Sequence, residues 1–112
     1  MRITRGSVLF LVAAAGALAF AKVGFVKDFN STYGVKPAST LGKSTCAVCH
    51  VGKSPKLNPY GIDLQKAMRA ENTKLLTGSV LKKVEGLDSD KDAITNANEI
   101  KADKLPGDPK SK

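Results

Sequence analysis

Residues 46–50, Cys46-Ala-Val-Cys49-His50, contain both cysteines and the only histidine of the 112-residue chain. The spacing C-x-x-C-H is the attachment signature of a c-type haem. Residues three apart lie on the same face of a helical turn, so two thiols at this spacing can reach the two vinyl groups of one porphyrin. His50, directly after the second thiol, then offers an imidazole to the iron. The stretch predicts one covalently bound haem with His50 as the proximal ligand.

Other functions of a paired cysteine fit this chain less well. A structural zinc site needs four nitrogen or sulfur ligands, and beyond the two thiols the chain has one histidine. A thioredoxin-like redox pair would stand in a βαβ pattern, but no alternating strand pattern occurs here. A plain disulfide between Cys46 and Cys49 remains as an alternative.

The N-terminus has the three parts of a secretory signal. Arg2 and Arg5 give a positive start, Val8 to Leu18 is an apolar run, and Ala19-Phe20-Ala21 is a small-x-small cleavage site. We expect a signal peptide over residues 1–21 and a single haem domain over residues 22–112. The apolar run is shorter than the roughly 20 residues of a membrane-spanning helix, which leaves an uncleaved anchor as the alternative. The prediction is export to the periplasm or the cell exterior, where covalent haem attachment is completed.

Charge and length bear on the partners and the core. The chain has 18 Lys+Arg and 10 Asp+Glu, and loss of the leader leaves a formal net charge of +6, since the leader carries two Arg and no acid. We expect redox partner proteins with acidic docking surfaces. The lysines are scattered, which argues against nucleic-acid binding.

The stability of so short a chain is marginal unless a disulfide, a metal or a cofactor adds to it. We therefore expect a mainly α fold in which short helices pack on the haem, with disorder in its absence.

The distal ligand of the iron is less determined by the sequence. A second histidine is lacking, and Met68 is the only methionine after the leader. A helix is predicted from about Pro59 to Ala70, with Asn58 as its N-cap. Met68 is then either the distal thioether ligand or a core residue, and the alternatives are a five-coordinate iron or an iron bound by Lys, Tyr60 or a partner chain. The apolar stripe of this predicted helix has the spacing i, i+4, i+7 and i+8 and consists of Tyr60, Leu64, Ala67 and Met68.

A second constellation, over residues 88–99, has the spacing of a twelve-residue calcium loop of the EF-hand type. The expected ligands are oxygen atoms of Asp88, Asp90, Asp92, Asn96 and Glu99, with the backbone carbonyl of Ile94. Ala93 stands where such a loop has glycine, and a Cβ in the left-handed region costs about 1–2 kcal/mol. We predict a structural calcium ion. The alternative is a solvated acidic turn that caps a helix starting near Asn96, with Glu99 in a capping box.

The remaining stretches predict little regular structure. Lys22 to Ser44 is expected to be an irregular lead-in with at most one short helical turn. Thr77 or Ser79 can cap a helix, and the segment from Leu105 to Pro109 cannot continue one. The apolar face of the helix after Thr77 is predicted to be Val80, Leu81, Val84 and Leu87.

Two stretches together resemble a known kind of protein. They are C-A-V-C-H followed by L-N-P-Y-G, within Cys46 to Gly61, and V-E-G-L-D-S-D-K-D-A-I-T-N-A-N-E-I followed by L-P-G-D-P, within Val84 to Pro109. They are similar to small exported monohaem cytochrome c-like proteins that end in a thrombospondin type 3 or EF-hand-like calcium loop. Such proteins are similar in plan to those of bacteria that respire with extracellular acceptors, and the resemblance implies electron transfer.

The expected function is therefore that of an electron carrier and not of an enzyme. With the sole histidine on the iron, neither a Ser/His/Asp set nor a distal histidine for peroxide chemistry is available. The rival functions are a haem-based ligand binder or sensor with an open iron, and a calcium-dependent surface interaction module in which the haem is structural.

Overall fold

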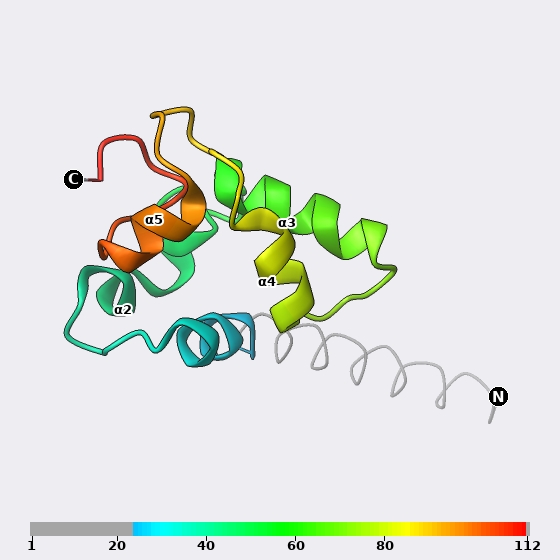
Figure 1. Cartoon of the computed structure of the whole chain (residues 1–112). Helices are drawn as coiled ribbons and strands as arrows, with labels where there is room; N and C mark the ends of the chain where they lie inside the picture. Colours follow the sequence, from blue (N-terminus) through cyan, green and yellow to red (C-terminus); the bar gives the residue numbers. More distant parts are fainter. Residues whose placement is uncertain (1–23, 112) are drawn as a thin grey trace, which may run out of the picture.

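The regular secondary structure of the described residues is helical. The structure is a computed structural model that describes residues 24–111, so the predicted signal peptide over residues 1–21 lies outside them. Within this range the closest approach to a strand is an isolated bridge between His50 and Leu57, and the expected mainly α class is confirmed. The elements are a helical segment over residues 24–33, α2 (Thr40–Ser44), the 3-10 turn η1 (Thr45–Val48), α3 (Pro59–Ala70), α4 (Gly78–Val84) and α5 (Asn96–Lys101) (Figure 1).

Helices α3 and α4 begin where their capping residues predict. The side chain of Asn58 accepts a hydrogen bond from the N–H of Gly61, and Pro59 occupies the first turn of α3. The side chain of Thr77 accepts one from the N–H of Val80 at the start of α4. Each cap satisfies a backbone donor that has no partner within the helix. The two helices pack against each other (Figure 1).

The expectation of an irregular lead-in is wrong, because residues 24–33 form a helix and α2 follows. Phe25, Phe29 and Tyr33 are spaced by four residues, which places them on one helical face. Phe29 is 2% exposed, and its ring centroid lies 5.1 Å from that of Tyr33 and 6.2 Å from that of Tyr60. Burial of these rings stabilises the helix.

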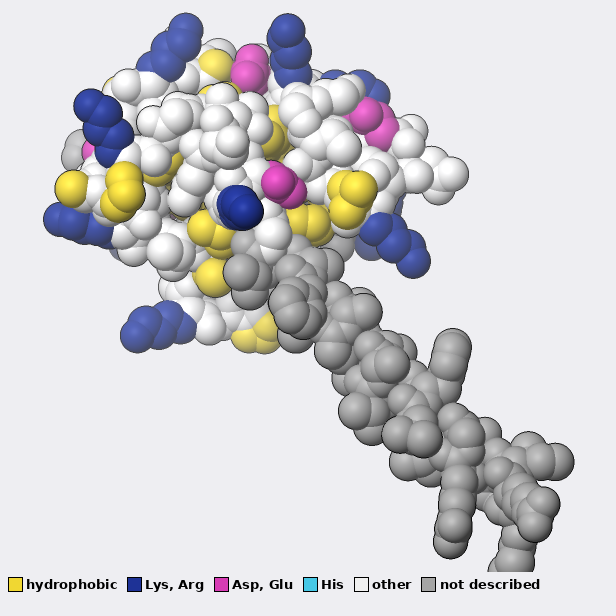
Figure 2. Space-filling view, turned by 90° about the horizontal axis from the view of Figure 1, so that it is seen from below, with side chains coloured by type: hydrophobic (Ala, Val, Ile, Leu, Met, Phe, Trp, Pro, Cys, Tyr) yellow, Lys and Arg dark blue, Asp and Glu magenta, His cyan; other side chains and the backbone are white. Residues whose placement is uncertain are grey.

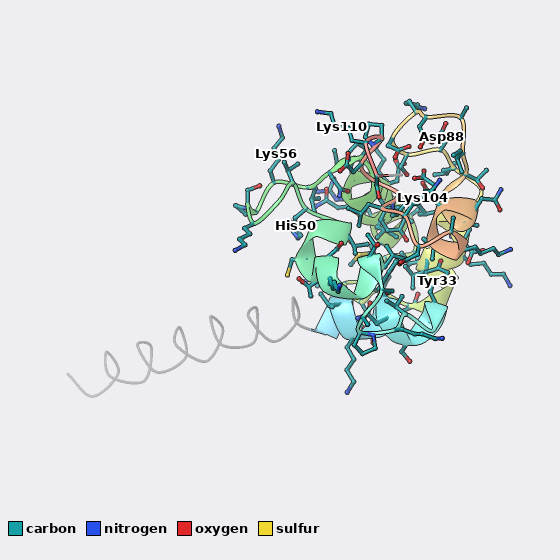
Figure 3. All side chains as sticks on the ribbon, turned by 90° about the vertical axis from the view of Figure 1, so that its left-hand side faces the viewer. Tyr33, His50, Lys56, Asp88, Lys104 and Lys110 are labelled. Carbon is teal, nitrogen blue, oxygen red and sulfur yellow. The ribbon has the colours of Figure 1, made fainter. Side chains whose placement is uncertain are left out.

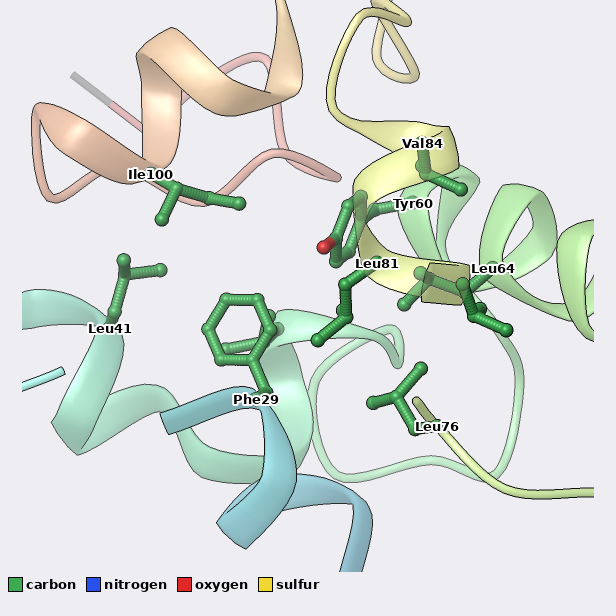
Figure 4. Packing of buried hydrophobic residues seen from close by; sticks show 10 residues of the cluster. Phe29, Leu41, Tyr60, Leu64, Leu76, Leu81, Val84 and Ile100 are labelled. Carbon is green, nitrogen blue, oxygen red and sulfur yellow. The ribbon is translucent and has the colours of Figure 1, made fainter. Parts of the chain in front are cut away.

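The core of the described residues is a cluster of buried side chains from several helices. The expected disorder in the absence of haem stays a prediction. Figure 4 shows Phe29 and Tyr60 between the aliphatic residues of several helices. Leu87, expected on the apolar face of α4, is 46% exposed because the helix ends at Val84. The buried cluster is Phe29, Leu41, Val48, Tyr60, Leu64, Leu76, Val80, Leu81, Val84 and Ile100.

The segment after α5 returns to the first half of the molecule, as the neighbouring α2 and α5 show in Figure 1. The carboxylate of Asp103 accepts hydrogen bonds from the N–H groups of Thr40 (2.8 Å) and Leu41 (2.9 Å) at the start of α2. Gly107 lies so close to the amide of Asn58 that a Cβ on Gly107 would overlap it. The C-terminal segment is therefore attached both to α2 and to the start of α3.

Basic side chains are dispersed over the face seen in Figure 2, with acidic and hydrophobic side chains between them. This distribution agrees with the scattered lysines of the sequence. Within the described part of the chain, no helix is both long enough and apolar enough to cross a membrane.

Candidate functional site

The cysteine and histidine motif lies in η1 and in the two residues that follow it. The Cys46 side chain is exposed and Cys49 is half-buried, and both thiols are free. The N–H of His50 donates to the carbonyl of Cys46 at 2.9 Å, which closes a helical turn over the motif. The structure thus brings both predicted thiols and the imidazole into one turn.

The ring of His50 is held by the loop that follows it. Its Nδ1 lies 3.1 Å from the carbonyl oxygen of Pro55. Since a carbonyl can only accept, Nδ1 carries the proton, and in the neutral ring Nε2 is the nitrogen with a free lone pair. The loop is closed by a hydrogen bond of 2.8 Å from the N–H of Val51 to the carbonyl of Lys56.

Asn58 fixes the motif to the start of α3. While its side-chain oxygen caps α3, its amide nitrogen donates to the carbonyls of Ala47 (3.2 Å) and Val48 (3.0 Å). Its own N–H donates to the carbonyl of Cys49 at 2.9 Å. Asn58 is 5% exposed, so these bonds are made in a dry environment where an unpaired polar group is costly.

Gly61 allows this close contact. A Cβ built on Gly61 would overlap the carbonyl oxygen of Cys49 and would lie 3.1 Å from Cδ2 of Leu57. The backbone of the motif and the first turn of α3 are therefore in direct contact at Gly61, where the Cβ of any other residue would clash with the motif.

An apolar cavity of about 320 Å³ opens beside the motif. One wall comes from the helical segment over residues 24–33 and the other from residues 45–55. The volume falls in the range of small-molecule and cofactor sites, roughly 300–1,000 Å³. The lining residues are Phe25, Val26, Phe29, Asn30, Thr45, Cys46, Val48, Cys49, His50, Lys53, Ser54 and Pro55.

The thiol of Cys49 is kept protonated by its surroundings. Burial, and secondly the neighbouring Cys46, raises the pKa of Cys49 to about 12. The thiolate is the nucleophile in thiol–disulfide exchange, so burial makes Cys49 poorly suited to be the attacking thiol.

Met68 is not brought to this cavity. It lies in α3, partly buried against the hydrophobic core, and it is not among the lining residues. The structure therefore gives it the position of a core residue, and distal ligation by Met68 stays a prediction.

The acidic loop forms a cluster at the other end of the chain, and Asp88 lies well apart from His50 in Figure 3. Carboxylate oxygens of Asp88, Asp90, Asp92 and Glu99 all lie within 4.8 Å of one another. Ala93, at the position expected for glycine, has a φ of 74°. The predicted backbone conformation is thus present although the residue is not glycine.

One expected ligand of the loop, Asn96, uses its side chain in other contacts. The side-chain oxygen of Asn96 accepts from the N–H of Ser89 (3.2 Å), and its nitrogen donates to the Ser89 hydroxyl (2.7 Å) and the Val84 carbonyl (2.9 Å). Asn96 therefore holds the loop closed and does not point into the cluster. The side chain of Ile94 is exposed and its N–H donates to Asp92, and ligation by its backbone carbonyl stays a prediction.

The cap of α5 also differs from the capping-box alternative. Thr95 is the N-cap, and its side chain accepts from the N–H of Asn98. Glu99, fully buried, belongs to the acidic cluster and not to a box.

Mutual proximity shifts the acidity of the cluster. Burial, followed by the neighbouring carboxylate of Asp92, raises the pKa of Asp90 to about 6. Burial, followed by the charges of Asp90 and Asp92, raises the pKa of Glu99 to about 8. Desolvation acts on Asp88 too, but the backbone N–H groups of Ala93 and Asp92 outweigh it and lower the pKa of Asp88. Without a cation the cluster therefore resists full ionisation.

Comparisons with protein families, with curated proteins and with solved structures found no match for this chain. The chemistry of the site consequently rests on its own residues.

Sequence reasoning missed the residues that position the motif. Asn58 was expected only as a helix cap, and its bonds to the motif join residues ten and eleven positions apart. Pro55 acts through its carbonyl, which every residue has, so its identity carries no signal. The cavity wall from Phe25 and Phe29 could have been found from their four-residue spacing.

Proposed function

We propose that this chain is an exported c-type cytochrome that carries single electrons on one haem, held covalently by Cys46 and Cys49 with His50 as the proximal iron ligand. The observation that carries the proposal is the hydrogen bond from Nδ1 of His50 to the Pro55 carbonyl. Ligating histidines are commonly fixed in this way by a backbone carbonyl. The bond leaves the lone pair of Nε2 for a metal.

The residues around the motif fit a haem. Both thiols and the imidazole line one apolar cavity, as a flat hydrophobic macrocycle requires. When bound, the haem would supply a reversible one-electron couple at its iron. Phe25, Val26 and Phe29, which line the cavity, would exclude water from it. The sole histidine is then committed to the iron, and the chain would act as a carrier and not as an enzyme.

A second function, haem-based ligand binding, is favoured by one observation. Met68 does not line the cavity, and the wall from residues 24–33 offers Phe25, Val26, Phe29 and the amide of Asn30. An iron without a protein ligand on that side would accept a small exogenous molecule.

Location is part of the proposal. Covalent haem attachment is completed in an oxidising compartment, and the predicted leader over residues 1–21 would take the chain there. The mass of the protein recovered from the periplasm or medium tests cleavage after Ala21.

Haem attachment is tested by expressing the chain with its leader in a bacterial host that attaches c-type haem after export. A denaturing gel stained for haem should show one haem per chain. The double variant Cys46→Ala/Cys49→Ala should lose the stain, and Ser54→Ala, which changes another lining residue, should keep it. An unstained wild type, or stain that survives the double variant, would overturn the proposal.

Electron transfer and ligand binding are separated by two measurements. A carrier should show a reversible one-electron redox titration and, when reduced, should resist carbon monoxide. A high-spin iron that binds carbon monoxide readily would instead support the ligand binder. In that case Met68→Ala should leave the spectrum unchanged, whereas loss of a far-red sulfur-to-iron band would identify Met68 as the distal ligand.

A further inference from the structure

The acidic cluster contains buried carboxylates without partners. Glu99 is 0% exposed and Asp90 is 8% exposed. Neither oxygen of either carboxylate has a hydrogen-bond partner. Buried charged groups are normally paired, hydrogen-bonded or bound to a metal, so these four oxygens need an explanation.

Neighbouring basic side chains do not pair with these carboxylates. Among residues 24–111 the one salt bridge joins Lys83 to Glu71, and neither residue belongs to the cluster. Lys91, within the loop, is exposed. The carboxylates of Asp88 and Asp92 accept hydrogen bonds from backbone N–H groups of the loop, which orient them beside Asp90 and Glu99.

The donor set consists of oxygen atoms alone. Hard cations such as calcium and magnesium take such ligands, whereas zinc and copper prefer nitrogen and sulfur. Calcium accepts six to eight oxygens in flexible geometry, while magnesium demands a near-ideal octahedron and keeps its waters. A cluster of four carboxylates in an irregular loop suits calcium better.

We propose that Asp88, Asp90, Asp92 and Glu99 bind one calcium ion, and that this ion fixes the C-terminal segment on which the cysteine and histidine motif rests. The site goes beyond the proposed electron transfer and does not depend on it.

Glu99 is connected through the C-terminal segment to the residues that support the motif. Glu99 lies in α5, and its carbonyl accepts from the N–H of Lys104 at 2.9 Å. The next contacts of this segment are Asp103 with the start of α2 and Gly107 with Asn58. Helix α2 runs directly into η1 and Asn58 bonds the carbonyls of Ala47 and Val48. Fixing Glu99 therefore orders the supports of the motif.

Binding is tested by titrating calcium chloride into the chelator-treated full chain in a calorimeter at constant ionic strength. We expect one site per chain and a higher thermal midpoint in calcium than in chelator. Glu99→Gln should weaken binding at least tenfold and remove the shift. Asp28→Asn, which removes an exposed carboxylate outside the cluster, should behave as the wild type.

The design remains decisive if one variant folds poorly. Glu99→Gln should fold in chelator, since an amide removes repulsion, and circular dichroism checks this. If it does not, Asp92→Asn replaces it with the same expectation. No heat and no midpoint shift at millimolar calcium, an equal shift in Glu99→Gln, or equal binding of magnesium would each overturn the calcium site.

The coupling has its own measurement. Hydrogen exchange of the Thr40 and Leu41 amides, which donate to Asp103, should slow on calcium addition in the wild type and in Asp28→Asn. Unchanged exchange at these amides with calcium bound would refute the transmission to α2 while leaving the site itself intact.

Discussion

Replacement of Gly61 by alanine tests the contact between α3 and the cysteine and histidine motif. Gly61 lies in the first turn of α3, where alanine alone would favour the helix by about 1 kcal/mol. The new Cβ would, however, overlap the carbonyl oxygen of Cys49, a backbone atom that cannot turn aside as a side chain can. Relief requires the motif and α3 to separate.

The cost can be worked from these contacts. Overpacking of a tight site costs about 1–3 kcal/mol. Separation also weakens the hydrogen bond of 2.9 Å from the N–H of Asn58 to the same carbonyl, worth about 1 kcal/mol. Subtracting the helix gain leaves a net loss of about 2 kcal/mol. For a domain of this size that is a fall of roughly 8–16 °C in Tm.

Gly78→Ala is the matched control. Gly78 also lies in the first turn of a helix, α4, and a Cβ there would meet nothing within 4 Å. This variant should be neutral or more stable by up to about 1 kcal/mol. Thermal and urea unfolding of both variants beside the wild type measure the difference. If Gly61→Ala unfolds at the wild-type temperature, α3 does not support the motif as described.

Three further substitutions test other parts of the structure. Asn58→Asp keeps an oxygen to cap α3 but loses the two donors to the motif carbonyls, and urea unfolding should show a loss of about 1–3 kcal/mol. Ala93→Gly should raise the stability by about 1 kcal/mol because it relieves a left-handed Cβ, whereas Ala67→Gly inside α3 should lower it by a similar amount; equal effects would contradict strain at Ala93. The backbone N–H groups of Leu41 and Thr40 lower the pKa of Asp103, so its contribution to stability is present above the ordinary carboxylate pKa and is lost as the pH falls through the lowered value. Asp103→Asn should therefore be less stable near pH 7 and lose less stability on acidification, and identical acid unfolding curves would refute this role.

The sequence predicts those elements whose signals are local. Asn58, Pro59 and Thr77 mark the starts of α3 and α4, and the apolar spacing after them marks the buried faces. Cys46, Cys49 and His50 could be proposed as site residues from the sequence because the C-x-x-C-H spacing is itself the signature of haem attachment. The four-residue spacing of Phe25, Phe29 and Tyr33 was as informative but was obscured by the glycine, serine and proline around it.

Contacts between distant parts of the chain could not be predicted from local patterns. The bonds of Asp103 to α2 span more than sixty residues. The amide of Asn96 satisfies the spacing of a calcium ligand, yet it is used by Ser89 and Val84. The position of a residue in the loop predicts that it carries a possible oxygen ligand. It does not predict whether that oxygen is already used in a hydrogen bond within the protein.

The motif is attached to the rest of the fold by contacts on both sides. His50 is oriented by the Pro55 carbonyl, and the backbone before it is held by the side chain of Asn58 at the start of α3. Of the motif, Val48 belongs to the buried core, and the other nine buried hydrophobic residues come from outside it. Because most of this core lies outside the motif, we expect the double variant Cys46→Ala/Cys49→Ala to lose haem attachment and to keep its helices. Loss of the helical circular dichroism signal in the double variant would instead show that the fold depends on haem attachment.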